Sequence, residues 1–180
     1  NVPLSMKDVE PEELPVSSAR APFVDGVVLR NGTKRLQKSL LFDTGGALTI
    51  LSPDVARGLG LKLDEPDLAA PIMGIGEGNQ TLKGLWIDSL HIPTEEGQPI
   101  SYTHVPIFVA DLRELHGTIG INMLTPSIYL DTDMDKISQN PMSIFASMKT
   151  GPVPFRRIVL DLSAGRLGLD PVTTNDETKK

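Results

Sequence analysis

The stretch that decides the fold is Leu40-Leu41-Phe42-Asp43-Thr44-Gly45, in which an ionisable residue ends an apolar run. Burying a lone carboxylate is costly, so a purely structural strand would rarely end in this way. The glycines at 45 and 46 permit a tight turn whose backbone N–H groups approach the carboxylate, and the Thr44 hydroxyl can donate a hydrogen bond across it. Asp43 is therefore a candidate catalytic acid or base. The alternative is an Asx-turn in which Asp43 caps its own loop.

The residues around this run predict strands joined by short turns. Residues 23–29 and 36–42 are β-rich and flank Asn31-Gly32, which is a strong hairpin signal. After Asp43 we expect a short strand over 48–51, and then a helix that starts at Ser52-Pro53 and ends near Gly58 or Gly60. Further strands are expected over residues 82–90, 105–110 and 127–131, with a terminal hairpin over 157–169. The fold class is mostly β, with one or two short helices.

The chain of 180 residues suits one domain with a core of its own. Residues 1–20 alternate charges with prolines and predict an N-terminal arm or linker, with a dimer-contact strand as the alternative. The domain is expected over residues 21–171, with a loop at 62–71 and an irregular insertion at 132–157. A polar tail follows at 172–180. The first residue is Asn rather than Met, so we expect a processed or excised soluble chain, whose compartment stays open.

Composition excludes several classes of function. The net charge of -6 argues against general affinity for nucleic acid or anionic membranes. The absence of cysteine excludes thiol catalysis, disulfides and cysteine-ligated metals. No apolar run approaches the roughly 18 residues that a membrane span needs. His91, His104 and His116 lack the spacing of metal ligands, so we expect no metal and no cofactor.

Several segments in this order resemble the retropepsin-like (clan AA) aspartic peptidases, in particular the single-lobe bacterial type. Residues 40–45 are similar to that family's apolar-apolar-Asp-Thr-Gly signature, and residues 48–61 to the strand and helix that follow it. Thr118-Ile119-Gly120 resembles the family's apolar-Gly turn, and residues 158–169 its closing hairpin. The resemblance covers residues 22–131 and 157–170. It implies a pepsin/retropepsin-like acid protease barrel, one lobe with a flap hairpin.

A glycine-rich run lies where the family has its flap. Its alternate glycines could also form a phosphate loop or a plain turn, but no Lys-Ser/Thr pair and no clear helix follow them. The resemblance implies a mobile hairpin that covers substrate. The substrate-binding residues are then expected to be Gly74, Ile75, Gly76, Glu77 and Gly78, and the apolar pocket walls Ile72, Ile75, Ile107 and Ile121.

The chemistry that the resemblance implies needs two carboxylates that share one proton and hold a water molecule. This chain supplies one Asp-Thr-Gly, whereas Asp131 and Asp161 are interpreted as turn residues. The second carboxylate is then expected from a symmetric homodimer, or from a missing second lobe. The implied activity is aspartic endopeptidase, acting on a peptide or protein through Asp43, Thr44 and Gly45.

The chain departs from the family pattern at a few positions. Gly46 stands where Ala or Ser is usual, so one side-chain hydrogen bond to the carboxylate is expected to be missing. Thr118, Asn122 and the long 132–157 segment also differ. These departures motivate a second hypothesis, a non-catalytic binding or assembly module with the same fold. A carbohydrate- or lipid-binding barrel would leave the apolar-Asp-Thr-Gly strand end unexplained.

Overall fold

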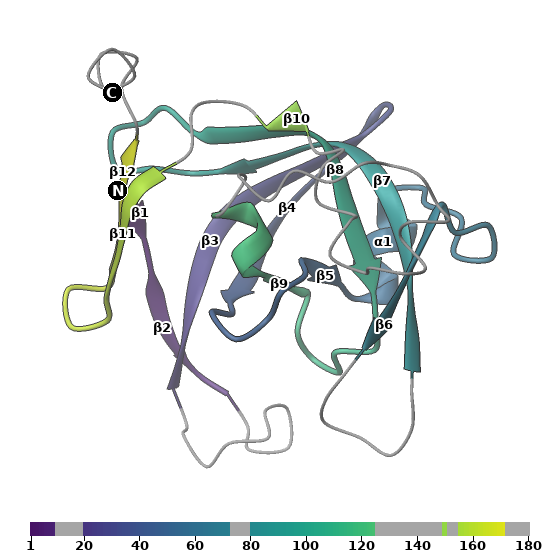
Figure 1. Ribbon diagram of the computed structural model, residues 1–180, viewed down its shortest axis with the longest axis horizontal. Coiled ribbons are helices and arrows are strands. Elements are labelled where there is room, and N and C mark those ends of the chain that lie inside the picture. Colours follow the sequence, from purple (N-terminus) through teal and green to yellow (C-terminus); the bar gives the residue numbers. More distant parts are fainter. Residues whose placement is uncertain (10–19, 73–79, 125–148, 151–154, 172–180) are drawn as a thin grey trace, which may run out of the picture.

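The computed structural model describes residues 1–9, 20–72, 80–124, 149–150 and 155–171, and the structural statements below concern these residues (Figure 1). The elements, in chain order, are β1 (Val2–Pro3), β2 (Ser5–Asp8), β3 (Arg20–Asn31), β4 (Lys34–Phe42), β5 (Ile50–Leu51), α1 (Pro53–Gly58), β6 (Leu68–Ile72), β7 (Gln80–Ile92), β8 (Ile100–Val109), β9 (Gly117–Ile119), the 3-10 helix η1 (Ile121–Met123), β10 (Lys149–Thr150), β11 (Phe155–Asp161) and β12 (Arg166–Pro171).

The hairpin predicted at Asn31-Gly32 is confirmed. Strands β3 and β4 pair antiparallel up to Asn31 and Lys34, which leaves Gly32 and Thr33 as the turn. Gly32 has a φ of +55°, in the left-handed region that glycine adopts without steric cost. Its N–H donates to a carboxylate oxygen of Asp88 at 2.7 Å, so the turn is also tied to β7.

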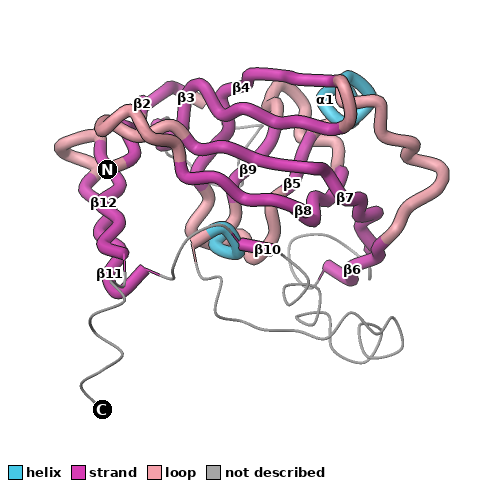
Figure 2. The backbone as a smooth tube through the Cα atoms, turned by 90° about the horizontal axis from the view of Figure 1, so that it is seen from above, coloured by secondary structure: helices cyan, strands magenta, loops and turns pink. Residues whose placement is uncertain are grey.

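The main sheet closes on itself, which makes the predicted barrel. Its strands follow the order β10-β8-β5-β9-β4-β3-β7-β6, and β7 also pairs with β8, so the path from β8 round to β7 is a closed ring. Figures 1 and 2 show these strands curling around a common interior. The interior holds the largest apolar cluster, whose fully buried members include Val27, Leu29, Leu40, Leu51, Leu59, Leu90, Val105, Ile107, Ile119 and Met123. The predicted mostly β class with short helices is therefore confirmed.

The helix α1 begins where the sequence predicts. The Ser52 hydroxyl accepts a hydrogen bond from the Val55 N–H at 3.4 Å, and Pro53 occupies the first turn. Both residue types are favoured there, because the first N–H groups of a helix have no partner inside it. Val55 and Ala56 are buried, so this short helix covers one side of the barrel core.

A strand replaces part of the predicted loop at 62–71. Strand β6 pairs antiparallel with β7, from Leu68 opposite Gly84 to Ile72 opposite Gln80. Leu68 and Ala70 are buried against Phe108 in a second apolar cluster, while Ala69 is exposed. The alternation is too short to be recognised next to the polar, Pro-interrupted residues before it. The two arms of the hairpin predicted around the glycine-rich tip are present.

The first nine residues belong to the domain rather than forming a loose arm. Strand β1 pairs with β12, and β2 pairs with β3. Val2 and Leu4 are buried in the main apolar core, and Val9 is buried in a separate apolar cluster with Phe23 and Leu41.

Some predicted segments lie outside the described residues. They are the glycine-rich tip at 73–79, the strand at 127–131, most of the insertion at 132–157 and the tail at 172–180. The terminal hairpin is present as β11 and β12, and Asp161 accepts hydrogen bonds from the Ser163 hydroxyl and the Ala164 N–H, as expected of a turn residue. Within the described ranges no helix is long and apolar enough to cross a membrane.

A charged cluster fastens β2 to the barrel. The Lys7 ammonium lies 2.5 Å from an Asp25 carboxylate oxygen and donates to the Ser39 hydroxyl, and the Ser5 hydroxyl donates to the other Asp25 oxygen. Side-chain hydrogen bonds to Asp25 from Lys7, Ser39 and Ser5, in that order of effect, lower the pKa of Asp25 from 3.8 to about 2.

The first prediction concerns this carboxylate. Because its pKa is lower in the folded chain, the Asp25 charge stabilises the fold above about pH 4, and this stabilisation is lost as the pH falls from 3.8 through about 2. Asp25→Asn should be less stable than the parent near neutral pH, with a difference that shrinks over that window. Urea unfolding at a series of pH values measures it. Asp54→Asn, in an exposed pair on α1, is the charge-matched control, and a pH-independent difference for Asp25→Asn would contradict the prediction.

Candidate active site

Asp43 stands where β4 leaves the core. Leu41 and Phe42 are buried and pair in parallel with Thr118 and Ile119 of β9. The Asp43 N–H extends this ladder by donating to the Ile119 carbonyl at 3.0 Å. Its side chain is half-buried, whereas Thr44 and Gly45 are exposed. The strand therefore presents a carboxylate at the rim of the barrel on a backbone that is fixed from two sides.

The turn after Asp43 folds back onto its carboxylate. One carboxylate oxygen accepts a hydrogen bond from the Gly45 N–H at 2.9 Å. This is the Asx-turn that the sequence left as an alternative, and it also holds the side chain in one orientation. The predicted hydrogen bond across the turn from the Thr44 hydroxyl is absent among the described residues. The structure thus brings Asp43 and Gly45 together and leaves the Thr44 side chain at the surface.

Gly46 faces the other carboxylate oxygen at close range. A Cβ atom at position 46 would lie 2.6 Å from Oδ2 of Asp43, which is closer than real Cβ contacts allow. The carboxylate can keep its present orientation only because this residue has no side chain. The sequence predicts a lost hydrogen bond at Gly46, and the structure adds a steric reason for glycine.

The loop that follows Asp43 crosses over the turn after β9. The Ile121 N–H donates to the Gly46 carbonyl at 2.8 Å. A Cβ atom on Gly120 would lie 2.3 Å from the Leu48 carbonyl oxygen, so the two backbones touch at this point. Glycine is needed here because any side chain would separate them. The apolar-Gly turn predicted at Thr118-Ile119-Gly120 therefore serves as the floor of the Asp43 loop.

A buried pair of polar side chains joins the two crossing segments. The Thr49 hydroxyl donates to the amide oxygen of Asn122 at 2.9 Å and accepts from the Gly120 N–H at 3.3 Å. Thr49 is fully buried and Asn122 nearly so. Buried polar groups are costly unless they are hydrogen-bonded, so these contacts specify how the segments cross.

Sequence reasoning missed the role of Thr49 and Asn122. It treated Thr49 as a strand residue and Asn122 as a departure from a family pattern. The signal that could have found them is a polar side chain inside each of two apolar segments, 48–51 and 119–124. A polar side chain in a buried segment needs a hydrogen-bond partner, and here Thr49 and Asn122 bond to each other.

One of the predicted pocket walls is wrong. Ile107 is fully buried inside the barrel, because the alternation along β8 turns Val105 and Ile107 toward the core. Ile121 is half-buried and packs against the same core. The side chain of Ile72 and the predicted flap residues Gly74, Ile75, Gly76, Glu77 and Gly78 lie outside the described part.

The site contains one carboxylate in the part of the chain that is described. The only hydrogen bond to the Asp43 carboxylate from a described residue is that of Gly45. No group of three His, Asp or Glu side chains that could hold a metal ion occurs among the described residues. Chemistry that needs a pair of carboxylates must therefore recruit the second from outside the described part of one chain.

Comparison with known proteins places these features in a family. A family model described as "Aspartyl protease" matches residues 24–123, which include the Asp43 loop and the Gly120 turn. No curated protein matches the chain. Among solved structures, the crystal structure of a retropepsin-like aspartic protease from Rickettsia conorii aligns over 88% of this chain and 85% of its own, at 11% sequence identity and a TM-score of 0.45.

The second prediction tests the buried polar pair. Thr49→Val keeps the shape of the side chain but leaves the Asn122 amide oxygen and the Gly120 N–H without this partner. We expect it to lower the free energy of unfolding by about 1–3 kcal/mol. Chemical unfolding measures the loss, and Thr49→Ser, which keeps the hydroxyl, should recover most of it. Equal stability of Thr49→Val and the parent would show that the pair does not hold the crossing together.

Proposed function

Since this chain belongs to the aspartyl protease family, we propose that it hydrolyses peptide bonds with a water molecule that two Asp43 carboxylates activate, one from each copy of a homodimer. The observation that carries the proposal is the placement of Asp43, half-buried at a strand end and fixed by the Ile119 carbonyl and the Gly45 N–H.

The chemistry follows from placing two such carboxylates side by side. Like charges in one site cannot both ionise easily, so the pair holds one proton between them. The ionised member takes a proton from water, which attacks the scissile carbonyl carbon. The protonated member donates its proton to the carbonyl oxygen, which gives a tetrahedral intermediate with two hydroxyl groups. The carboxyl that took the proton from water then donates it to the amide nitrogen, while the other carboxylate takes a proton from one hydroxyl. The C–N bond breaks to release the amine and the new carboxylic acid, and the pair again holds one proton. Two glycines position the Asp43 carboxylate for this role. The Gly45 N–H donates a hydrogen bond to one oxygen, and Gly46, which has no side chain, leaves space at the other.

A two-fold axis is the economical source of the second carboxylate. Such an axis beside the strand end would bring Asp43 of one chain next to Asp43 of its partner without any further residue. An extended peptide could then lie between the two copies, with backbone hydrogen bonds to the strands around it. The tip between β6 and β7, residues 74–78, remains the predicted cover of that peptide.

The unpaired edge of β11 is a candidate contact surface for a second copy of the chain. Val159, Leu160 and Leu162 are 45%, 37% and 47% exposed, and they are the large apolar side chains exposed in the described residues. Strand β11 pairs with β12 on one side and with no described strand on the other. An exposed apolar edge strand is a template for pairing with another chain.

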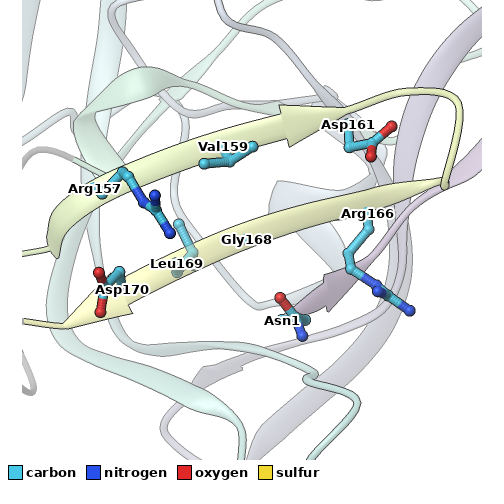
Figure 3. A pocket seen from close by; sticks show the side chains of 8 residues that line it. All are labelled: Asn1, Arg157, Val159, Asp161, Arg166, Gly168, Leu169 and Asp170. Carbon is cyan, nitrogen blue, oxygen red and sulfur yellow. The ribbon is translucent and has the colours of Figure 1, made fainter.

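The charges along β11 would match those of a second β11 strand paired with it antiparallel. Figure 3 shows Arg157 and Asp161 on either side of Val159. All three residues line a hollow of about 330 Å³. If two β11 strands pair antiparallel with Val159 opposite its own copy, Arg157 of each chain stands opposite Asp161 of the other. Opposite charges across a strand pair stabilise it and like charges destabilise it. This register favours a second copy of the chain as the partner.

The third prediction concerns the shared carboxylate pair. Asp43→Asn should keep the fold and lower peptide cleavage by at least about 10²- to 10⁴-fold, measured on a peptide library between about pH 4 and about pH 7. Parent and variant chains are then unfolded and refolded together in equal amounts. A shared site predicts about a quarter of the parent activity at the same total chain concentration, because only dimers with two aspartates cleave.

Other results of that experiment would contradict the proposal. About half of the parent activity in the mixture would mean that each chain acts alone. Full activity of Asp43→Asn would remove Asp43 from the chemistry. A parent that binds peptides without cleaving them would favour the non-catalytic binding module, and a strictly monomeric parent that cleaves would require a second carboxylate within one chain.

The fourth prediction tests the β11 edge. Val159→Lys would bring two ammonium groups together on the axis of the dimer, so we expect the dissociation constant of the dimer to rise at least about tenfold. Sedimentation measures the mass, and cleavage should fall in parallel with dimer content. Gln37→Lys adds the same charge at an exposed position of β4 and should change neither. A Val159→Lys variant that stays as dimeric as the parent would exclude this edge as the contact.

A further inference from the structure

A hollow on the outer surface of the barrel is unrelated to the Asp43 loop. It has a volume of about 390 Å³ and is lined by residues of β3, β4, β7 and β8 and by Pro93 and Pro99 of the turn between β7 and β8. Arg35 lies near the start of β4, whereas Asp43 follows the last residue of that strand. The hollow therefore sits at the opposite end of β4 from the proposed catalytic carboxylate.

Two arginines face each other across the strands that form this hollow. Arg30 of β3 and Arg35 of β4 are direct cross-strand partners, and both line the cavity. Like charges in this position destabilise a sheet unless something compensates them. Neither guanidinium makes a salt bridge with a described residue. Asp88 of β7 is next in the chain to Ser89, the partner of Arg30, but one of its carboxylate oxygens accepts a hydrogen bond from the Gly32 N–H.

A histidine held between two serines completes the surface. The His91 ring lies 2.9 Å from the Ser89 hydroxyl through Nε2 and 2.7 Å from the Ser101 hydroxyl through Nδ1. Strand pairing puts Ser89 opposite Arg30 and His91 opposite Val28, so the ring lies on the same face as the arginines. Burial lowers the pKa of His91, and the charges of Arg30 and Arg35 lower it further.

We propose that this hollow binds a phosphate group, free or as a monoester, between Arg30 and Arg35 with His91 beside it. A phosphate dianion offers enough oxygens for two guanidiniums at once, whereas one carboxylate is satisfied by one bidentate arginine. The anion removes the repulsion between the two guanidiniums. The remaining volume accommodates the organic part of a small phosphate ester.

Phosphate binding at this site is also expected to change the pKa of His91. A bound dianion reverses the electrostatic field that Arg30 and Arg35 impose on the ring. The His91 imidazolium then gains an opposite charge in place of two like ones, and its pKa rises. The groups that face the ring are Arg30, Arg35, Ser89 and Ser101, so the arginines and the anion decide the direction of this shift.

The experiment uses the whole chain and three probes at equal ionic strength: inorganic phosphate, glycerol phosphate and sodium chloride. NMR follows the imidazole of His91 against pH, with His104 and His116 as internal references, and thermal unfolding gives affinity. We expect both phosphates to raise the pKa of His91 and the unfolding temperature relative to chloride. Tighter binding of the ester would identify an organic phosphate as the ligand, and tighter binding of the inorganic ion would identify free phosphate.

Variants separate the site from general charge effects. Arg30→Gln and Arg35→Gln should each weaken phosphate binding about tenfold or more. In chloride they should be at least as stable as the parent, because each removes one of two opposed like charges. Lys62→Gln removes the same charge from an exposed pair with Glu65 and should bind phosphate as the parent does.

Three results would overturn the inference: no change in the pKa of His91 with either phosphate, parent-like phosphate binding by both arginine variants, or equal weakening by Lys62→Gln. Peptide cleavage is a separate readout, because the proposed site shares no residue with the Asp43 loop. Loss of phosphate binding with intact cleavage, or the reverse, would therefore decide the two proposals independently.

Discussion

The structure depends on one crossing, in which the loop after Asp43 passes over the turn after β9. The backbones touch where Gly120 meets the Leu48 carbonyl, and the buried hydrogen bonds of Thr49 hold them in place. Strand β9 pairs with β4 on one side and β5 on the other. The crossing that closes the barrel is therefore also the one that fixes the proposed catalytic carboxylate. A substitution at the crossing is therefore expected to affect both the closure of the barrel and the position of Asp43.

The parts of the fold that the sequence predicts well are those specified by neighbouring residues. Gly32 requires a turn, Ser52 and Pro53 begin a helix, and Asp43 is conspicuous because it ends an apolar run. The parts it misses depend on partners far along the chain. Strand β6 exists because β7 pairs with it, and the N-terminal strands are ordered by β3 and β12.

The same limit applies to the candidate site. Asp43 and Gly45 are found from the sequence because they lie in one motif. The interior position of Ile107 follows from the alternation along β8, which a pattern of apolar residues does not reveal by itself. Thr49 and Asn122 are 73 positions apart, and nothing in either neighbourhood identifies the other as its partner. Strand β4 also separates the two proposed sites, with Arg35 near its start and Asp43 just beyond its end.

The long span of the crossing has a kinetic consequence. Contacts between distant residues require a large loop to close before they stabilise anything, so they form late and slow the folding of β-rich domains. The β3–β4 hairpin needs only local contacts and can form first. A newly made chain would then expose Asp43 on a strand end whose supporting floor is still absent. The site proposed for Asp43 would therefore be completed only in the last steps of folding.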